Sequence, residues 1–222
     1  MKKIDDDSID LVIIDPPYQI EGLKNNHRAY IKELTDYGLD KGVRMETIHE
    51  LSRVMKAINI YIWCNKIQIL DYMNYYVGEL SCRFEILKWI KVNVPPHFHN
   101  KYLNDTEYCL HFHESDTLKV HSYADGGTYH ISSLNKADKL QYQHPTIKPL
   151  EFTKQMIRNS SRPGDIVLDC YLGSGTTAVA AKETMRHYIG IEWQRQFYET
   201  ANDRIRGISA SGQTSVFTEF DE

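Results

Sequence analysis

A β-branched apolar run near the start of the chain stops at a carboxylate followed by two prolines. The run IDLVII at residues 9–14 predicts a buried strand, and Asp15-Pro16-Pro17-Tyr18 follows it directly. The prolines fix their own φ, and Pro17 holds Pro16 in extended geometry. Ligands bind at the carboxyl ends of the strands in open α/β sheets, so we expect Asp15 and Tyr18 to lie at a binding edge.

The residue types of this turn suit chemistry on an exocyclic amine. The Asp15 carboxylate accepts one N–H, a proline-region carbonyl accepts the other, and the Tyr18 ring offers a face on which a base can stack. A surface turn after a core strand, with Tyr18 as ordinary packing, explains these four residues equally well. The rest of the chain has to decide between the two.

Apolar periodicity along the chain alternates between the spacings of strands and helices. The pattern predicts helices over 45–57, 67–77, 149–160, 176–185 and 194–206, and strands over 58–63, 84–92, 106–113, 166–169 and 187–191, with an edge strand within 214–220. This alternation predicts an α/β fold with a mostly parallel sheet. We expect one domain over 1–222, a functional flap over 19–44, and a small insertion over 114–143 on the ligand edge.

The composition is that of a globular protein, with 41% hydrophobic and 25% charged residues. We expect a cytoplasmic location, because no apolar run is long enough to span a membrane and no signal peptide is recognisable. The four cysteines are scattered without a Cys-x-x-Cys pair, which predicts reduced thiols. The net charge of −4 neither indicates nor excludes a nucleic-acid partner.

A glycine loop follows the strand predicted at 166–169. Asp169 ends that strand, Gly173-x-Gly175 opens the next helix, and Glu192 ends the following strand. Such a backbone lets a ligand approach helix N–H groups, and the second carboxylate suits ribose hydroxyls. The pattern also fits a dinucleotide fingerprint, so NAD competes. Asp169 precedes the glycines by four residues and reaches the pocket itself, which favours a ligand with a cationic amine over a pyrophosphate.

With these pieces the chain resembles the amino-methyltransferases of DNA, in the permuted group whose catalytic motif precedes the cofactor loop. The matching segments, in the family's order, are Asp15-Pro16-Pro17-Tyr18, His144-Pro145-Thr146-Ile147-Lys148-Pro149, the loop from Asp169 to Thr177, and Ile189-Gly190-Ile191-Glu192. The segments at 88–93 and 104–108 match less specifically. The resemblance implies a Rossmann-like methyltransferase fold of about seven strands with helices on both faces and a circularly permuted motif order.

The resemblance further implies S-adenosylmethionine as the cofactor. Asp169, Gly173 and Gly175 would lie along its methionine part, Glu192 would take the ribose hydroxyls, and Trp193 would pack on the adenine. Thr146 and Lys148 would lie near the methionine carboxylate. The other residues expected to contact the cofactor are Asp15, Tyr171, Ser174 and Thr176.

Aspartate at position 15, where cytosine-N4 enzymes more often carry serine, directs the expectation to adenine N6 in duplex DNA, reached by base flipping. Asp15, Pro16, Pro17 and Tyr18 are then the catalytic residues. Three alternatives remain: a cytosine-N4 or RNA methyltransferase of the same fold, a non-catalytic nucleic-acid-binding module, and, more distantly, an NAD oxidoreductase.

Candidate contacts to the DNA are cationic or imidazole side chains in three polar stretches. They are Lys24, His27, Arg28, His97, His99, Lys101, Lys136 and Lys139, and part of 114–143 could recognise the target sequence. His97-x-His99 and His111-x-His113 lack further ligands at suitable spacing, so no metal is expected. A homodimer and a cognate restriction enzyme are further partners that this interpretation allows.

Overall fold

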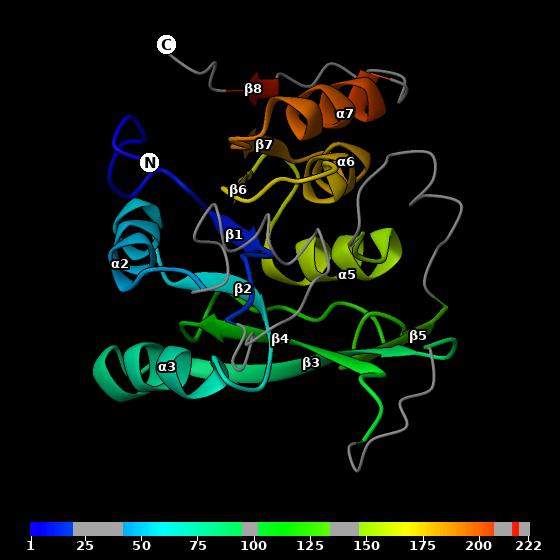
Figure 1. Ribbon diagram of the computed structural model, residues 1–222. Coiled ribbons are helices and arrows are strands. Elements are labelled where there is room, and N and C mark those ends of the chain that lie inside the picture. The colour runs from blue at the N-terminus through cyan, green and yellow to red at the C-terminus, as the bar shows by residue number, and fades with distance from the viewer. Residues whose placement is uncertain (20–41, 95–101, 134–146, 207–214, 218–222) are drawn as a thin grey trace, which may run out of the picture.

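The computed structural model describes residues 1–19, 42–94, 102–133, 147–206 and 215–217 (Figure 1). Its centre is an eight-stranded sheet with the order β5-β3-β4-β2-β1-β6-β7-β8. The strands are β1 (Leu11–Ile14), β2 (Asn59–Cys64), β3 (Arg83–Lys91), β4 (Thr106–His113), β5 (Tyr129–Ser132), β6 (Ile166–Asp169), β7 (His187–Gly190) and β8 (Ser215–Phe217). The helices are α2 (Met45–Val54), α3 (Ile69–Met73), α5 (Leu150–Ser160), α6 (Thr176–Glu183) and α7 (Arg195–Arg206).

The expectation of a mostly parallel sheet is confirmed. β4 is antiparallel to both of its neighbours, β2 and β3, and every other pair of adjacent strands is parallel. The described sheet has eight strands, close to the expected number of about seven. The additional strand is β5, which lies inside the predicted insertion and pairs with Lys88–Lys91 of β3. Four residues at a sheet edge leave too short an alternation to be recognised in the sequence.

Helices cover both faces of the sheet, as expected (Figure 1). Successive residues of β1 point to opposite faces, which assigns them to two different cores. Leu11 and Ile13 pack in the core that includes Phe152 of α5 and the alanines of α6. Val12 and Ile14 pack in the core that includes Ile48 of α2. The central strand is therefore fully buried, and only its carboxyl end is available to a ligand.

The helix predicted over 67–77 begins and ends two residues later than expected. It consists of α3 and a π-helical segment over Asn74–Glu79. The Asn65 carboxamide starts it by accepting the backbone N–H groups of Ile67 and Gln68 at 3.0 and 3.3 Å. The π-helical segment places the adjacent rings of Tyr75 and Tyr76 together in the core.

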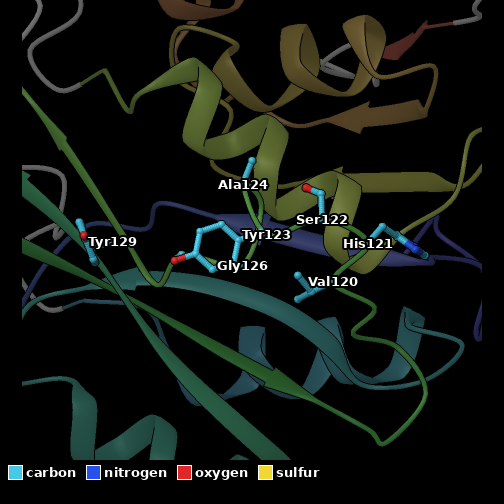
Figure 2. Close-up of a pocket in the computed structure, with 8 residues that line it drawn as sticks. Val120, His121, Ser122, Tyr123, Ala124, Gly126 and Tyr129 are labelled. Carbon is cyan, nitrogen blue, oxygen red and sulfur yellow. The ribbon is translucent and has the colours of Figure 1, made fainter.

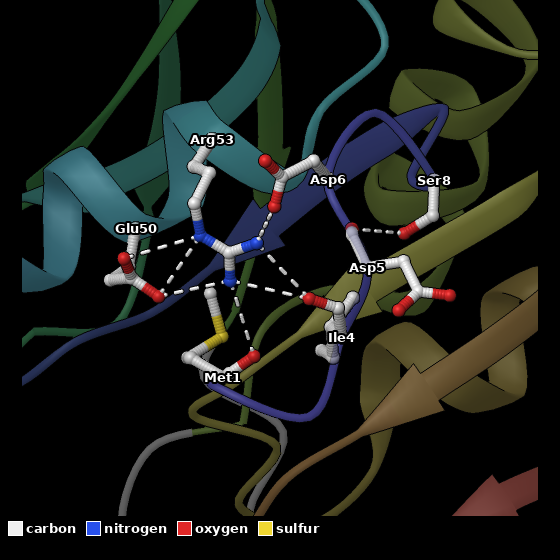
Figure 3. A network of polar contacts seen from close by, with 7 residues as sticks. All are labelled: Met1, Ile4, Asp5, Asp6, Ser8, Glu50 and Arg53. Atoms are coloured by element: carbon white, nitrogen blue, oxygen red, sulfur yellow. Dashed lines mark hydrogen bonds and ion pairs between the residues drawn. The ribbon is translucent and has the colours of Figure 1, made fainter.

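Arg53 ties the first residues of the chain to α2 (Figure 3). Its guanidinium donates to the carboxylates of Glu50 and Asp6 and to the backbone carbonyls of Met1 and Ile4. We name these five residues the Arg53 cluster. No helix among the described residues has both the length and the apolar character needed to cross a membrane.

Candidate catalytic and cofactor site

The Asp15–Tyr18 turn lies at the carboxyl end of β1, as the sequence predicts. Two side chains just before α3 hold the backbone of this turn. Gln68 donates to the carbonyl of Pro17 at 3.4 Å, and Asn65 donates to the carbonyl of Gln19 at 2.6 Å. Because these carbonyls are fixed, the turn that carries Asp15 is anchored at its C-terminal end as well as by the strand.

Four charged side chains of alternating sign meet beside this turn, and we name them the edge cluster: Lys91, Glu107, Lys148 and Asp15. Lys148 pairs with Asp15 and lies 3.1 Å from a carboxylate oxygen of Glu107. Lys91 lies 2.5 Å from the other Glu107 oxygen. The Lys148 side chain is 8% exposed and that of Asp15 24%, so the cluster is mostly withdrawn from water.

The chain brings these residues together through the order of its strands. Lys91 ends β3, Glu107 lies near the start of the antiparallel β4, and Lys148 precedes α5 by two residues. The Lys148 ammonium lies 5.1 Å from the ring centroid of Trp63 and 5.6 Å from that of Tyr18. These two rings cover the ammonium and attract it electrostatically.

Burial and pairing set opposite pKa shifts for the two carboxylates. Burial alone would raise the pKa of Glu107, but Lys148 and Lys91 lower it to about 2. Asp15 pairs with one lysine, Lys148, and forms a hydrogen bond with Tyr18. Burial, together with the Glu107 charge, raises the pKa of Asp15 despite that partner. Asp15 is therefore the less strongly held carboxylate of the cluster.

The glycine loop lies at the carboxyl end of β6. Gly175 caps α6 with a φ of +82°, and a Cβ there would meet the Cβ of Ala201 on α7 at 3.1 Å. Gly173 also has a positive φ, of 52°. Glycine adopts this left-handed geometry at little cost, which explains the two glycines flanking Ser174.

Two predicted cofactor carboxylates frame this loop. Asp169 accepts the backbone N–H of Tyr171 at 2.9 Å, and its burial raises its pKa to about 7. The two oxygens of Glu192 accept the backbone N–H groups of Gly173 at 2.9 Å and Gln194 at 2.8 Å. Each carboxylate keeps further acceptor capacity, because a carboxylate offers about four lone-pair sites.

The remaining residues expected to contact the cofactor differ in exposure. Trp193 is 48% exposed and follows Glu192 directly. Ser174 and Thr176 are buried, and Arg204 of α7 donates to the hydroxyls of both, at 3.3 and 3.0 Å. These two hydroxyls therefore already brace the loop against α7.

The turn and the glycine loop are neighbours because β1 and β6 pair in parallel, with Leu11 opposite Val167 and Val12 opposite Leu168. The carboxyl ends of both strands therefore lie at one edge of the sheet. The negative charge of Asp15 also raises the pKa of Asp169. The structure thus joins the two predicted sites into one.

Nine of the predicted site residues lie outside the described part of the chain: Lys24, His27, Arg28, His97, His99, Lys101, Lys136, Lys139 and Thr146. Described residues that flank those stretches lie at the edge of the sheet that carries the Asp15–Tyr18 turn. Gln19 is held by Asn65, Lys91 ends β3, and Ser132 ends β5 beside it.

Sequence reasoning did not assign a role to Glu107, Lys91 or Trp63. Glu107 belongs to the segment 104–108 that only weakly matched the family, and Lys91 to the segment 88–93. The available signal was a charged residue at the end of each of two predicted strands, because a charge that becomes buried requires a partner.

The histidine pair on β4 belongs to the core. His111 and His113 are buried and stacked, with ring centroids 4.7 Å apart, and His111 Nε2 lies 3.1 Å from Asn59 Oδ1. The described residues contain no group of three or more His, Cys, Asp or Glu arranged to hold a metal. All four cysteines are free thiols.

A surface hollow lies apart from this site, where residues 120–129 lie against α5 (Figure 2). Asp125, within this segment, ties it to α5. Gln155 and Asn159 donate to the Asp125 carbonyl at 2.8 Å, and Arg158 pairs with its carboxylate. None of the lining residues belongs to the site at the end of β1 and β6. They are Val120 to Ala124, Gly126, Gly127 and Tyr129.

Comparison with known proteins points to one family. Residues 9–203 match a family model described as DNA methylase (N6_N4_Mtase). The Type II methyltransferases M2.MboI of Moraxella bovis and M2.DpnII of Streptococcus pneumoniae are each 28% identical to this chain. The alignment with M2.MboI covers 94% of this chain and 85% of that protein, and the alignment with M2.DpnII covers 92% and 85%.

Two solved structures of DNA methyltransferases have a similar fold. The complex of M1.HpyAVI with SAM superposes with a TM-score of 0.65 at 25% identity, covering 89% of both chains. The cytosine-N4-specific PvuII DNA methyltransferase superposes with a TM-score of 0.67 at 16% identity, covering 95% of this chain and 83% of that one. At 16% identity, the likeness to the PvuII enzyme is one of fold alone.

Proposed function

This chain belongs to the DNA methylase family, and we propose that it uses S-adenosylmethionine to methylate the N6 amine of adenine in duplex DNA. One observation carries the proposal: the pairing of β1 with β6 sets the Asp15–Tyr18 turn beside the glycine loop. An amine acceptor and a nucleoside-binding loop at one edge are what methyl transfer to a base requires.

The residues around the glycine loop fit S-adenosylmethionine. The buried Asp169 carboxylate has neutral hydrogen-bond partners, the N–H of Tyr171 and the hydroxyl of Thr177. A cationic ligand would stabilise its charged form. Glu192 would take ribose hydroxyls, and the exposed face of Trp193 would cover the adenine. When bound, the cofactor supplies an electrophilic methyl group on a sulfonium sulfur.

Asp15 and its turn would prepare the target amine. Lys148 occupies one carboxylate oxygen of Asp15, so the amine N–H would be accepted by the other. The Pro16 carbonyl would accept the second N–H, and the Tyr18 ring would stack on the base. These contacts localise the nitrogen lone pair and orient it, so positioning and electrostatics supply most of the rate.

The target adenine would have to leave the duplex to reach Asp15, at an expected cost of a few kcal/mol. We assign the backbone contacts to the eight cationic and imidazole residues predicted above. The chain leaves the catalytic edge at Gln19, Lys91 and Ser132 toward the three stretches that carry them. Part of 114–143 would recognise the target sequence, because β5 within this segment ends at Ser132, beside Lys91.

Transfer of a labelled methyl group to unmethylated duplex DNA, followed by nucleoside analysis, tests the proposal. Wild type should yield N6-methyladenine. Asp15→Asn should yield none, because its amide cannot supply the negative charge, whereas Asp71→Asn, which neutralises an exposed carboxylate on α3, should match wild type. N4-methylcytosine or methylated RNA would instead favour the alternative substrates, and cofactor binding without any product would favour a binding module.

The relatives named above are Type II methyltransferases, and a cognate restriction enzyme would therefore be a partner of this chain too. Cleavage of unmodified DNA, and not of DNA modified by this enzyme, would identify it. A homodimer is the other proposed assembly, and sedimentation at enzyme concentrations used for catalysis would detect it.

A further inference from the structure

Glu107 is the hub of the edge cluster. One of its oxygens meets Lys91, and the other accepts the hydroxyl of Tyr18 at 3.3 Å and lies 3.1 Å from Lys148. Its side chain is only 16% exposed. A single carboxylate on β4 thus contacts the base-stacking ring and the partner of the catalytic carboxylate.

The reaction as proposed needs only one charged side chain, that of Asp15, and one lysine would neutralise this carboxylate. A second buried pair, Glu107 with Lys91, adds a desolvation penalty and so calls for an explanation. Without Glu107, Lys148 would face Asp15 alone and bind it more tightly, in competition with the target amine. Glu107 attracts Lys148 from the other side, and Lys91 balances the charge of Glu107.

Glu107 also restrains Tyr18. The Tyr18 ring lies beside the Lys148 ammonium, and its hydroxyl is tied to the carboxylate that holds that ammonium. Rotation of the ring would break this hydrogen bond, so the stacking surface keeps one orientation before the base arrives.

On the basis of the proposed function, we infer that Glu107 is a positioning residue for methyl transfer. It divides Lys148 between two carboxylates, so that Asp15 keeps an acceptor for the amine, and it fixes the ring of Tyr18. Lys91 supports it from β3. Glu107 and Lys91 themselves lie on β4 and β3 and contact the residues of the Asp15–Tyr18 turn and Lys148, so we assign their role to the base.

The ionisation of Asp15 provides a direct readout. The groups that act on or are acted on by its charge are Lys148, Glu107, Tyr18, Cys64 of β2, Cys109 of β4 and Asp169 of β6. Of these, Lys148 and the hydrogen bond with Tyr18 lower the pKa of Asp15, and Glu107 raises it. Changing Glu107 or Lys91 should therefore move that pKa in opposite directions.

The test compares Glu107→Gln, Lys91→Met and the double variant with wild type. In Glu107→Gln, Lys148 turns fully to Asp15. The Asp15 pKa and the acidic limb of the kcat–pH profile should move to lower pH, and kcat should fall by about tenfold to a hundredfold. In Lys91→Met, Glu107 draws Lys148 away from Asp15, and the limb should move to higher pH. Glu85→Gln, on the exposed face of β3, is the control.

Carbon-13 NMR of the Asp15 carboxyl follows the same titration without turnover. Shifts of the same sign in both variants, or none, would overturn the inference, as would a Glu107→Gln profile identical to wild type. If Glu107→Gln does not fold, the double variant, with one charge of each sign removed, should place the limb at lower pH than Lys91→Met does. A wild-type enzyme that methylates nothing would contradict the proposed function, while the titration would still decide whether Glu107 governs Asp15.

Discussion

The edge cluster and the Arg53 cluster are both networks of ion pairs, and they differ in burial. In the edge cluster, the side chains of Lys91 and Lys148 are 12% and 8% exposed. In the Arg53 cluster, Arg53 is 29% and Asp6 72% exposed. Water solvates the second network and screens it, whereas the first depends on its own partners. Similar ion pairs therefore lower the pKa of a buried carboxylate to about 2 in one place and fasten the first residues to α2 in the other.

Removing Lys148 should have the largest effect on stability. Lys148→Met leaves Asp15 and Glu107 as neighbouring buried carboxylates, which should reduce the free energy of unfolding by about 3–5 kcal/mol. Urea denaturation measures it. Lys154→Met is the matched control, because Lys154 lies on the adjoining helix α5 and pairs with Glu151 and Glu183 at a more exposed position. It should lose no more than about 1 kcal/mol. Equal losses would mean that burial does not separate the two kinds of network.

The pH dependence of stability should separate Glu107 from the exposed carboxylates. Its pKa is about 2 in the folded protein and close to 4.5 when unfolded, so its ionised form stabilises the fold. That contribution, roughly 3 kcal/mol, is complete above about pH 4.5 and lost as the pH falls towards 2. The difference in unfolding free energy between wild type and Glu107→Gln, measured between pH 6 and 2.5, should shrink accordingly. A constant difference would contradict the ion-pair origin of the shift.

Asp169 extends the comparison to a buried carboxylate whose hydrogen-bond partners are neutral. Its pKa of about 7 means that protonation competes with a cationic ligand at physiological pH. Affinity for S-adenosylmethionine should therefore weaken roughly tenfold between pH 8 and pH 6, as the ionised fraction falls. Calorimetric titration at several pH values measures it. Asp169→Asn should bind weakly and with little pH dependence, and a wild type that behaves likewise would remove Asp169 from the cofactor site.

The smallest effect is expected at Arg53. Arg53→Met should loosen residues 1–8 locally, because the carbonyls of Met1 and Ile4 lose their donor. Amide exchange at Ile4 should quicken while the thermal midpoint changes little, and 1 M salt should diminish the difference from wild type. Arg195→Met, an exposed arginine on α7, is the control and should leave Ile4 unchanged. A large loss of global stability would place Arg53 with the buried cluster.

The strand ends were predictable because their signals are local. The apolar run at 9–14 ends at Asp15 and two prolines. The run at 166–169 ends at Asp169, before glycines that adopt positive φ, so both turns could be placed from the sequence. The parallel pairing of their strands followed from the alternation of strands and helices.

The edge cluster was not predictable in the same way. Glu107 meets Lys148 because β4 enters the sheet antiparallel between β3 and β2, an order that periodicity does not reveal. The link from Arg204 to Ser174 and Thr176 likewise depends on how α7 packs on α6. Contacts between residues far apart in the sequence require the topology first.

The pairing of β1 with β6 has a consequence for synthesis of the protein. About 150 residues separate the two strands, and at about 5–20 residues per second the ribosome needs roughly ten to thirty seconds to make them. During that time the apolar strand β1 can pair with β2 but not with β6. The chain therefore carries the Asp15–Tyr18 turn long before it has the glycine loop, and a nascent chain arrested before β6 has half of the proposed site and an open sheet edge.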